Sequence, residues 1–412
     1  MSALRHAVSQ RFPAYTAFAA VLSGAGLPIY IFAPKYYADT FGVSLTALGA
    51  VLFGLRLFDV VQDPVLGWIA ERLRGGKAIA IGAAAALMAA SMVGLFAVTP
   101  PIAPLWWFGL MITGLFSAFS FLTINFYAQG IAKVGDSDGG HVRLAAWRES
   151  GALLGICLAA IAPTVLLGMG ADPFAAFAWG FAAVTILATV FMWREWTPAS
   201  VEAKPTPVRA ILSDPLARRL LLLALVNATP LAVSSTLFLF FVESRLNAPG
   251  WEGPLLVLFF LAAAVSSPIW SALARKFGEK PVLLCAMVLA VAAFGWTLTL
   301  GAGDTTAFAI ICVLSGATIG ADLTLLPAMF AKRMARIAPN GGQGFGLWSL
   351  VSKFTLAFAA VLLLPLLEST GFQAGTDNSD AALTMLTGLY ALVPSVLKIV
   401  AIILLALTSL ED

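Results

Sequence analysis

The chain has 412 residues, of which 60% are hydrophobic and only 11% are charged. A soluble domain carries about 45–50% apolar and about 25% charged residues, so this composition excludes a soluble enzyme with one hydrophobic anchor. At roughly 20 residues per membrane-spanning helix, the apolar content is enough for about twelve spans. Continuous apolar runs disfavour a β-barrel, whose strands alternate in polarity. The net charge of +3 is too small to indicate nucleic-acid binding.

Apolar segments follow one another on both sides of a polar stretch at residues 196–216. Their length and their few charges predict transmembrane α-helices. We therefore expect an all-α membrane protein with two pseudo-symmetric six-helix bundles, at residues 1–195 and 217–412, joined by a cytoplasmic linker. The expected spans are residues 14–38, 43–70, 78–99, 104–132, 143–168, 174–195, 217–244, 253–274, 281–301, 305–331, 344–369 and 383–408.

Lysine and arginine are unevenly distributed between the connections. They gather in the N-terminus, the polar stretch and the even-numbered connections, whereas the odd-numbered connections hold only Lys35 and Arg245. The positive-inside rule then predicts that both termini are cytoplasmic, in a multi-pass protein of the cell (inner) membrane.

The two halves also repeat a short pattern. Pro64 to Arg72 ends the second span, and Pro268 to Lys276 ends the eighth, with the proline, an alanine and a charged pair in register. Internal repeats with a substrate site between them are typical of secondary transporters.

Charges inside the second span are the main functional signal. Asp59 and Asp63 lie one helical turn apart on one face, and Arg56 lies about one turn earlier. An ionised carboxylate in the membrane costs at least about 2.5–3.5 kcal/mol, so two of them predict a bound cation or a proton. The alternative is a salt-bridge cluster in which Arg56 neutralises one aspartate.

Other polar residues within the spans extend this candidate site. Gln62, Ser120 and Thr123 offer oxygens to a cation, although such residues also pack membrane helices together. Lys353, in the eleventh span, either faces the acidic pair or extends to the interface. Further candidates are Asp322 in the tenth span and Arg148 and Glu149 in the fifth, and for the last two a solvated or salt-bridged role is the alternative. The role of Lys398, in the twelfth span, is left open.

The cysteine and histidine residues do not indicate a metal site, a disulfide or a catalytic site. Cys157, Cys285 and Cys312 lie far apart inside apolar runs, so we expect buried structural thiols and neither a disulfide nor a metal site. With only two histidines, a histidine-centred site is not expected, and no cofactor is predicted.

Four stretches resemble the glycoside–pentoside–hexuronide:cation symporters (the melibiose-permease-like family) of the major facilitator superfamily. The most specific is Arg56-Leu-Phe-Asp59-Val-Val-Gln-Asp63-Pro64-Val-Leu-Gly67. The other three are Tyr36-Tyr37-Ala-Asp39, Arg143-Leu-Ala-Ala-Trp147-Arg148-Glu149, and Gly344-Phe-Gly-Leu-Trp348 through Lys353. The resemblance implies the major facilitator fold.

The resemblance also implies roles for single residues. Asp59 and Asp63 would hold the coupling cation, Ser120 would assist, and Lys353 would take part in coupling. Arg148 and Tyr127 would contact sugar. The chain departs from melibiose-type members where Ser23 and Thr123 replace two sugar-binding acids. Gln62 replaces an asparagine, which leaves sodium and proton both open.

We therefore expect a sodium- or proton-coupled transporter that moves a small solute, glycoside-like or otherwise polar, by alternating access. Its expected partners are the solute, the coupling cation and the lipid bilayer, and the expected state is a monomer. A transporter of a lysolipid or other amphiphile is the alternative on the same fold. The alternative of another class is a metal-dependent prenyltransferase-type enzyme, but its second acidic motif could only be Asp136 and Asp138, which lie in a polar connection.

Overall fold

The computed structural model describes residues 12–26, 33–73, 76–134, 140–168, 172–196, 206–338, 341–372 and 378–409. Within these ranges the chain is helical and contains no strand. In this described part, nine helices are long and apolar enough to cross a membrane. The protein is therefore a multi-pass membrane protein, and its all-helical fold class is confirmed.

The helices of the N-terminal half are α2 (Pro13–Gly24), α3 (Ala33–Phe41), α4 (Leu45–Arg72), α5 (Lys77–Phe96), α6 (Pro104–Val134), α7 (Gly140–Gly168), α8 (Pro173–Met192) and η2 (Trp193–Glu195). Those of the C-terminal half are α9 (Val208–Ser213), α10 (Pro215–Phe240), η3 (Phe241–Arg245), α11 (Glu252–Phe277), α12 (Glu279–Gly295), η4 (Trp296–Thr299), α13 (Thr305–Ile337), α14 (Gly342–Glu368), α15 (Asp380–Thr387), η5 (Gly388–Leu392) and α16 (Val393–Ala406).

Most expected spans coincide with helices. The first expected span, residues 14–38, contains α2 and part of α3, and residues 27–32 of it lie outside the described part of the chain. The clearest difference is at α13, which continues past the expected end at residue 331 to Ile337, because a polar helix end can extend into water.

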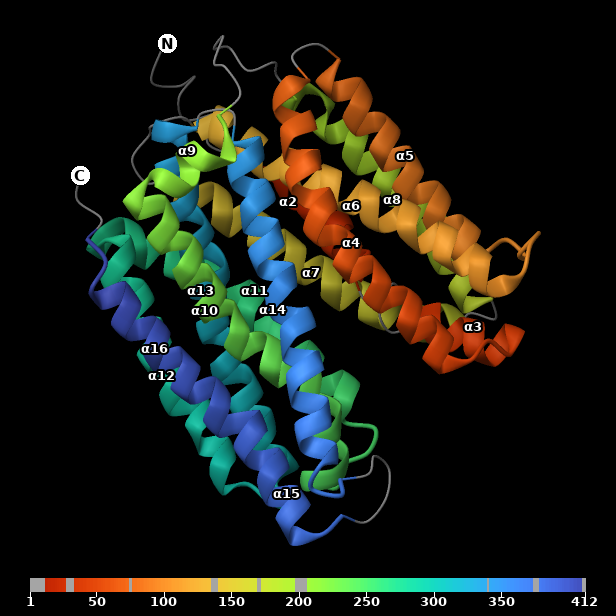
Figure 1. Ribbon diagram of the computed structural model, residues 1–412, viewed down its shortest axis with the longest axis vertical. Helices are drawn as coiled ribbons and strands as arrows, with labels where there is room; N and C mark the ends of the chain where they lie inside the picture. The colour runs from red at the N-terminus through yellow and green to blue at the C-terminus, as the bar shows by residue number, and fades with distance from the viewer. Residues whose placement is uncertain are drawn as a thin grey trace.

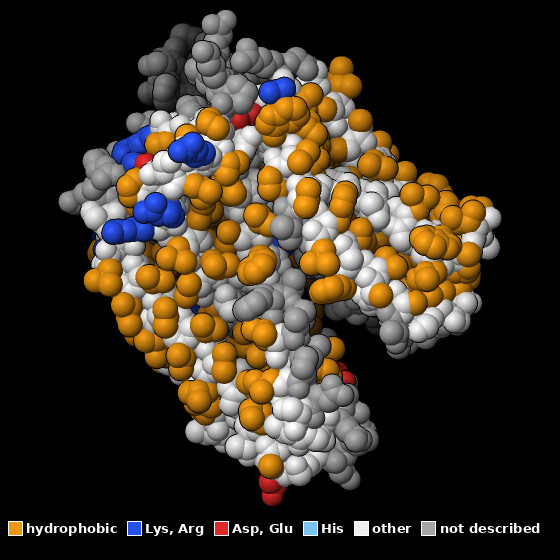
Figure 2. Space-filling model, viewed as in Figure 1, with side chains coloured by type: hydrophobic (Ala, Val, Ile, Leu, Met, Phe, Trp, Pro, Cys, Tyr) orange, Lys and Arg blue, Asp and Glu red, His pale blue; other side chains and the backbone are white. Residues whose placement is uncertain are grey.

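The two halves meet at the end of the molecule that holds both termini (Figure 1). One hydrophobic core at this end contains Ile131 and Val142 of the N-terminal half together with Ala274 and Phe345 of the C-terminal half. Away from the termini the halves diverge, and Figure 2 shows the surface hollowed between them. The protein is thus closed on one side and open on the other.

The outer surface is largely apolar, as Figure 2 shows over both halves. Trp106, Trp179 and Leu187 are among its exposed large side chains. Exposure of this kind suits contact with lipid. It also explains a wrong expectation: Cys157 and Cys312 are buried, but Cys285 is exposed on α12, because an apolar thiol facing lipid need not be buried in protein.

Candidate functional site

The two aspartates of α4 and the lysine of α14 form one charged cluster. Lys353 Nζ lies 3.2 Å from Asp59 Oδ2 and 2.9 Å from Asp63 Oδ2, and it donates to Asp63 Oδ1 at 3.0 Å. Asp59 is 2% exposed and Asp63 is fully buried. One ammonium group of the C-terminal half therefore bridges two carboxylates of the N-terminal half.

Glycines allow α4 and α14 to approach closely beside this cluster. A Cβ atom on Gly67 would lie 2.8 Å from the carbonyl oxygen of Gly342, and one on Gly346 would lie 3.1 Å from the carbonyl oxygen of Asp63. Lys353 follows Gly346 by two helical turns and so lies on the same face of α14. The glycine contact thereby brings the lysine to the acidic pair.

Two hydroxyl groups complete the cluster. Lys353 Nζ donates to Ser120 Oγ on α6 at 2.6 Å, and Ser349 Oγ donates to Asp63 Oδ2 at 2.7 Å. Sequence reasoning missed Ser349, although its position four residues before Lys353 places it on the same helix face. The carboxylate and hydroxyl oxygens are ligands that suit a hard cation.

The remaining candidates around the acidic pair have other surroundings. Gln62 Oε1 accepts a hydrogen bond from Ser117 Oγ at 2.9 Å. Thr123 Oγ1 is buried with no hydrogen-bond partner in the part of the chain that the structure describes. The side chain of Arg56 lies outside the described part. Within that part, no three histidine, cysteine or acidic residues gather as a metal site.

Tyr127, Arg148 and Glu149 form a second cluster, between α6 and α7. The guanidinium carbon of Arg148 lies 3.7 Å from the centroid of the Tyr127 ring, and Arg148 Nε donates to Glu149 Oε1 at 2.9 Å. The Tyr127 hydroxyl donates to the same oxygen at 3.2 Å. Arg148 and Glu149 are 5% and 7% exposed, so the pair is buried and ion-paired, not solvated.

This second cluster touches the opposite half. The ring of Tyr127 lies 5.0 Å from that of Phe345 on α14, between centroids. Nearby, Glu71 at the end of α4 accepts hydrogen bonds from the backbone N–H groups of Gln343 at 2.8 Å and Thr206 at 3.1 Å. These contacts join the halves at the closed side.

Asp322 lies in a third cluster, inside the C-terminal half. Lys398 on α16 forms an ion pair with Asp322 on α13 and donates to Asn227 Oδ1 on α10 at 2.7 Å. The three side chains line a pocket of about 80 Å³. The structure therefore pairs Asp322 with Lys398, away from Asp59 and Asp63. Asn227 was missed, and its only signal was an amide within an apolar span.

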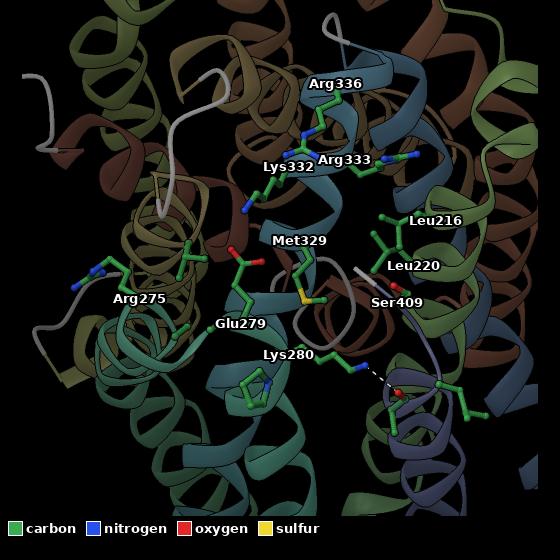
Figure 3. A pocket seen from close by; sticks show the side chains of 16 residues that line it. Leu216, Leu220, Arg275, Glu279, Lys280, Met329, Lys332, Arg333, Arg336 and Ser409 are labelled. Atoms are coloured by element: carbon green, nitrogen blue, oxygen red, sulfur yellow. Dashed lines mark hydrogen bonds between the residues drawn. The ribbon is translucent and has the colours of Figure 1, made fainter. Parts of the chain in front are cut away.

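A larger pocket, of about 1050 Å³, lies at the terminal side of the C-terminal half and is drawn in Figure 3. We call it the basic pocket, because five lysine or arginine side chains and one acidic side chain line it. These are Arg275, Lys280, Lys332, Arg333, Arg336 and Glu279.

Two helical halves that close at one end around buried charges are typical of secondary transporters. The chain belongs to the family described as MFS/sugar transport protein, which matches residues 13–412. It is thus a secondary transporter of the major facilitator superfamily and not an enzyme.

Solved structures agree with this fold. The chain is similar to a bacterial homologue of the iron transporter ferroportin in an outward-facing state, with a TM-score of 0.69 and 14% identity over 95% of this chain and 99% of the other. It is also similar to the E. coli fucose:proton symporter FucP, with a TM-score of 0.66 and 13% identity over 96% of this chain and 97% of the other.

Proposed function

We propose that this protein is a sodium- or proton-coupled transporter of a small polar solute, similar to the glycoside–pentoside–hexuronide:cation symporters. The observation that carries the proposal is the contact of Lys353 with both Asp59 and Asp63. Two carboxylates and one ammonium leave one negative charge among these three side chains. A monovalent cation or a proton would bind at the carboxylate oxygens of this site, because acidic side chains inside a membrane protein are costly unless their charge is matched.

Coupling would follow from competition at the carboxylates. A cation that binds Asp59 and Asp63 uses carboxylate oxygens that now contact the ammonium group of Lys353. Because Lys353 belongs to the opposite half, its displacement changes the energy of the contact between α4 and α14. A ligand shifts a conformational equilibrium only through different affinities for the two states, and this contact provides such a difference.

The direction of opening supports a place for this conformation in the transport cycle. The halves are closed at the side of the termini and open at the other side (Figure 2). With both termini in the cytoplasm, as the positive-inside rule predicts, the open side faces outward. We propose an inner-membrane protein in an outward-facing state that is ready to receive solute and cation.

The second cluster would bind the solute. The guanidinium of Arg148, held against Tyr127, supplies hydrogen-bond donors, and its Nη2 atom has no hydrogen-bond partner in the described residues. Ser23 and Thr123 stand where melibiose-type members have sugar-binding acids, which argues against a melibiose-like substrate. A different glycoside or another polar metabolite fits these donors better.

Thermal unfolding of the purified protein against a panel of neutral sugars and polar metabolites tests this function. Each solute is measured with sodium or with potassium, at two pH values. A ligand that binds the native state stabilises it, so a coupled solute should raise the Tm more when its cation or proton is present. A solute that stabilises the protein equally under all four conditions would contradict coupling.

Uptake of that solute into proteoliposomes is the second measurement. Counterflow of labelled solute distinguishes a carrier from a channel. A rate of uptake that changes neither with a sodium gradient nor with a pH gradient would overturn the proposal.

A further inference from the structure

The basic pocket lies at the ends of helices that are long and apolar enough to cross a membrane. It is lined by the first turns of α10 and α12, by the last turns of α11 and α13, by the end of α16 and by Val142 of α7. Figure 3 shows Arg275, Lys332 and Arg336 around one side of the pocket and Lys280 below them. Five basic side chains and one acidic side chain line the pocket. Asp214 balances the charge of Arg333, so basic side chains still outnumber acidic ones by five to two among the lining residues and Asp214.

Apolar side chains also line the pocket. They are Leu216 and Leu220 of α10, which lie below Arg333 in Figure 3, and Met329 of α13, which lies below Lys332. Leu407, which also lines the pocket, is 74% exposed. Basic and apolar side chains in one pocket suit a molecule with an anionic head and an apolar body.

Two of the basic side chains are held in position by the fold. Arg333 makes a two-pronged ion pair with Asp214, with Nε 3.0 Å from Oδ1 and Nη2 2.5 Å from Oδ2. Lys280 donates to the carbonyl oxygens of Ala406 at 2.9 Å and Thr408 at 2.8 Å. Lys280, fixed in this way, loses little freedom when a ligand binds, which favours affinity. Arg333 is matched by Asp214 and contributes mainly to the shape of the pocket.

We propose that the basic pocket binds a phosphate-bearing anion, with the headgroup of an anionic phospholipid as its source. Basic pockets between transmembrane helices bind anionic headgroups because lysine and arginine at the membrane surface each contribute about 1 kcal/mol. The volume of about 1050 Å³ has room for a headgroup and the beginning of its acyl chains. Neither the proposed cation site nor the proposed solute site includes these residues, so this inference is independent of them.

The test compares the full-length protein in nanodiscs of phosphatidylcholine alone and of phosphatidylcholine with phosphatidylglycerol. The wild type should have a higher Tm with the anionic lipid. The variant Lys332→Gln/Arg336→Gln should lose most of this gain and bind phosphatidylglycerol at least about tenfold more weakly by native mass spectrometry. Arg218→Gln/Arg219→Gln is the matched control, because these exposed arginines lie at the same membrane edge but do not line the pocket.

A charge-preserving variant and a soluble probe complete the test. Lys332→Arg/Arg336→Lys should keep the lipid effect, which separates loss of charge from misfolding. In detergent, stabilisation by inorganic phosphate but not by phosphatidylglycerol would identify a free anion as the ligand and overturn the lipid source. Equal loss of the lipid effect in both glutamine variants would show unspecific surface attraction and overturn the site.

Discussion

Lys353 and Asp63 are 290 residues apart in the chain, yet Lys353 Nζ donates to Asp63 Oδ1 at 3.0 Å. The contact joins the two halves in the middle of an apolar protein. Removing one partner of a buried ion pair is costly, because the other charge is left uncompensated. The proposed coupling therefore needs a cation that takes the place of Lys353 at the carboxylates and a change of conformation that gives Lys353 new surroundings.

Neutralising the acidic pair should abolish coupling. Asp63→Asn and Asp59→Asn each remove one of the two carboxylates that are proposed to bind the cation, and the remaining carboxylate is paired with Lys353. We expect cation-dependent stabilisation to fall below detection while the fold persists. The measurement is the Tm as a function of sodium concentration and of pH, with Asp172→Asn, at the exposed start of α8, as control. Undiminished cation-dependent stabilisation in both variants would refute the assignment.

Removing the lysine should have the opposite effect on the cation. In Lys353→Gln the two carboxylates lose their internal ammonium, so an external cation no longer competes with it. We expect the half-saturating cation concentration to fall by about tenfold, a change of about 1.4 kcal/mol. Without cation, the variant should be less stable than the wild type. Lys276→Gln, at the far end of α11, is the control. An unchanged cation affinity in Lys353→Gln would show that the ammonium group of Lys353 and the cation do not compete for the carboxylates.

A methyl group at the glycine contact should open the closed side. In Gly67→Ala the new Cβ would lie 2.8 Å from a backbone oxygen of α14, and such overpacking costs about 1–3 kcal/mol. The variant should also expose the contact, measured as faster thiol labelling of Gln343→Cys. Gly180→Ala on α8 is the control, since its Cβ would meet nothing within 4 Å. Equal rates of thiol labelling in the Gly67→Ala and Gly180→Ala variants would show that the added methyl group does not open the contact between α4 and α14.

The ion pair inside the C-terminal half should behave as a unit. Asp322→Asn or Lys398→Met alone leaves one buried charge and should cost about 3–5 kcal/mol. The double variant removes both charges and should cost clearly less than the sum of the two. Chemical unfolding in detergent measures the cycle, and strict additivity would show that the two residues do not interact.

Asp214 should make stability depend on pH. The hydrogen bond from Arg333, with the backbone N–H of Ala217, holds the pKa of Asp214 below its ordinary value. The folded protein therefore gains stability from the charged form above the ordinary pKa of about 3.9, and loses it as the pH falls through the lowered value. Asp214→Asn should cost about 1–2 kcal/mol at pH 7.

Thermal unfolding between pH 3.5 and 7 measures the difference in stability between Asp214→Asn and the wild type. This difference in stability should become smaller toward pH 3.5. A difference that is constant with pH would show that the altered helix cap, which asparagine can also form, explains the whole effect.

The sequence predicts the fold well, because apolar length decides which segments span a membrane. It also singles out Asp59, Asp63 and Lys353, since a charged side chain inside a membrane span is costly in any orientation. It leaves open whether Lys353 faces the acidic pair, and it does not predict the hydrogen-bond partners of these residues. Ser349 and Asn227 are ordinary polar residues until the helices are packed, and Glu71 lies at a helix end, where charge is common. These partners depend on the distances between packed helices, which contacts such as Gly67 against Gly342 set and which the sequence does not provide.

The aromatic contact between the halves offers a direct optical measurement. Trp348 lies on α14 between Phe345, which meets Tyr127 of the other half, and Ser349, which donates to Asp63. Its ring lies 5.0 Å from that of Phe330. When the halves separate on this side, water would reach the indole and its emission would shift to longer wavelength. The difference spectrum against Trp348→Phe would then follow the conformational cycle without any attached label.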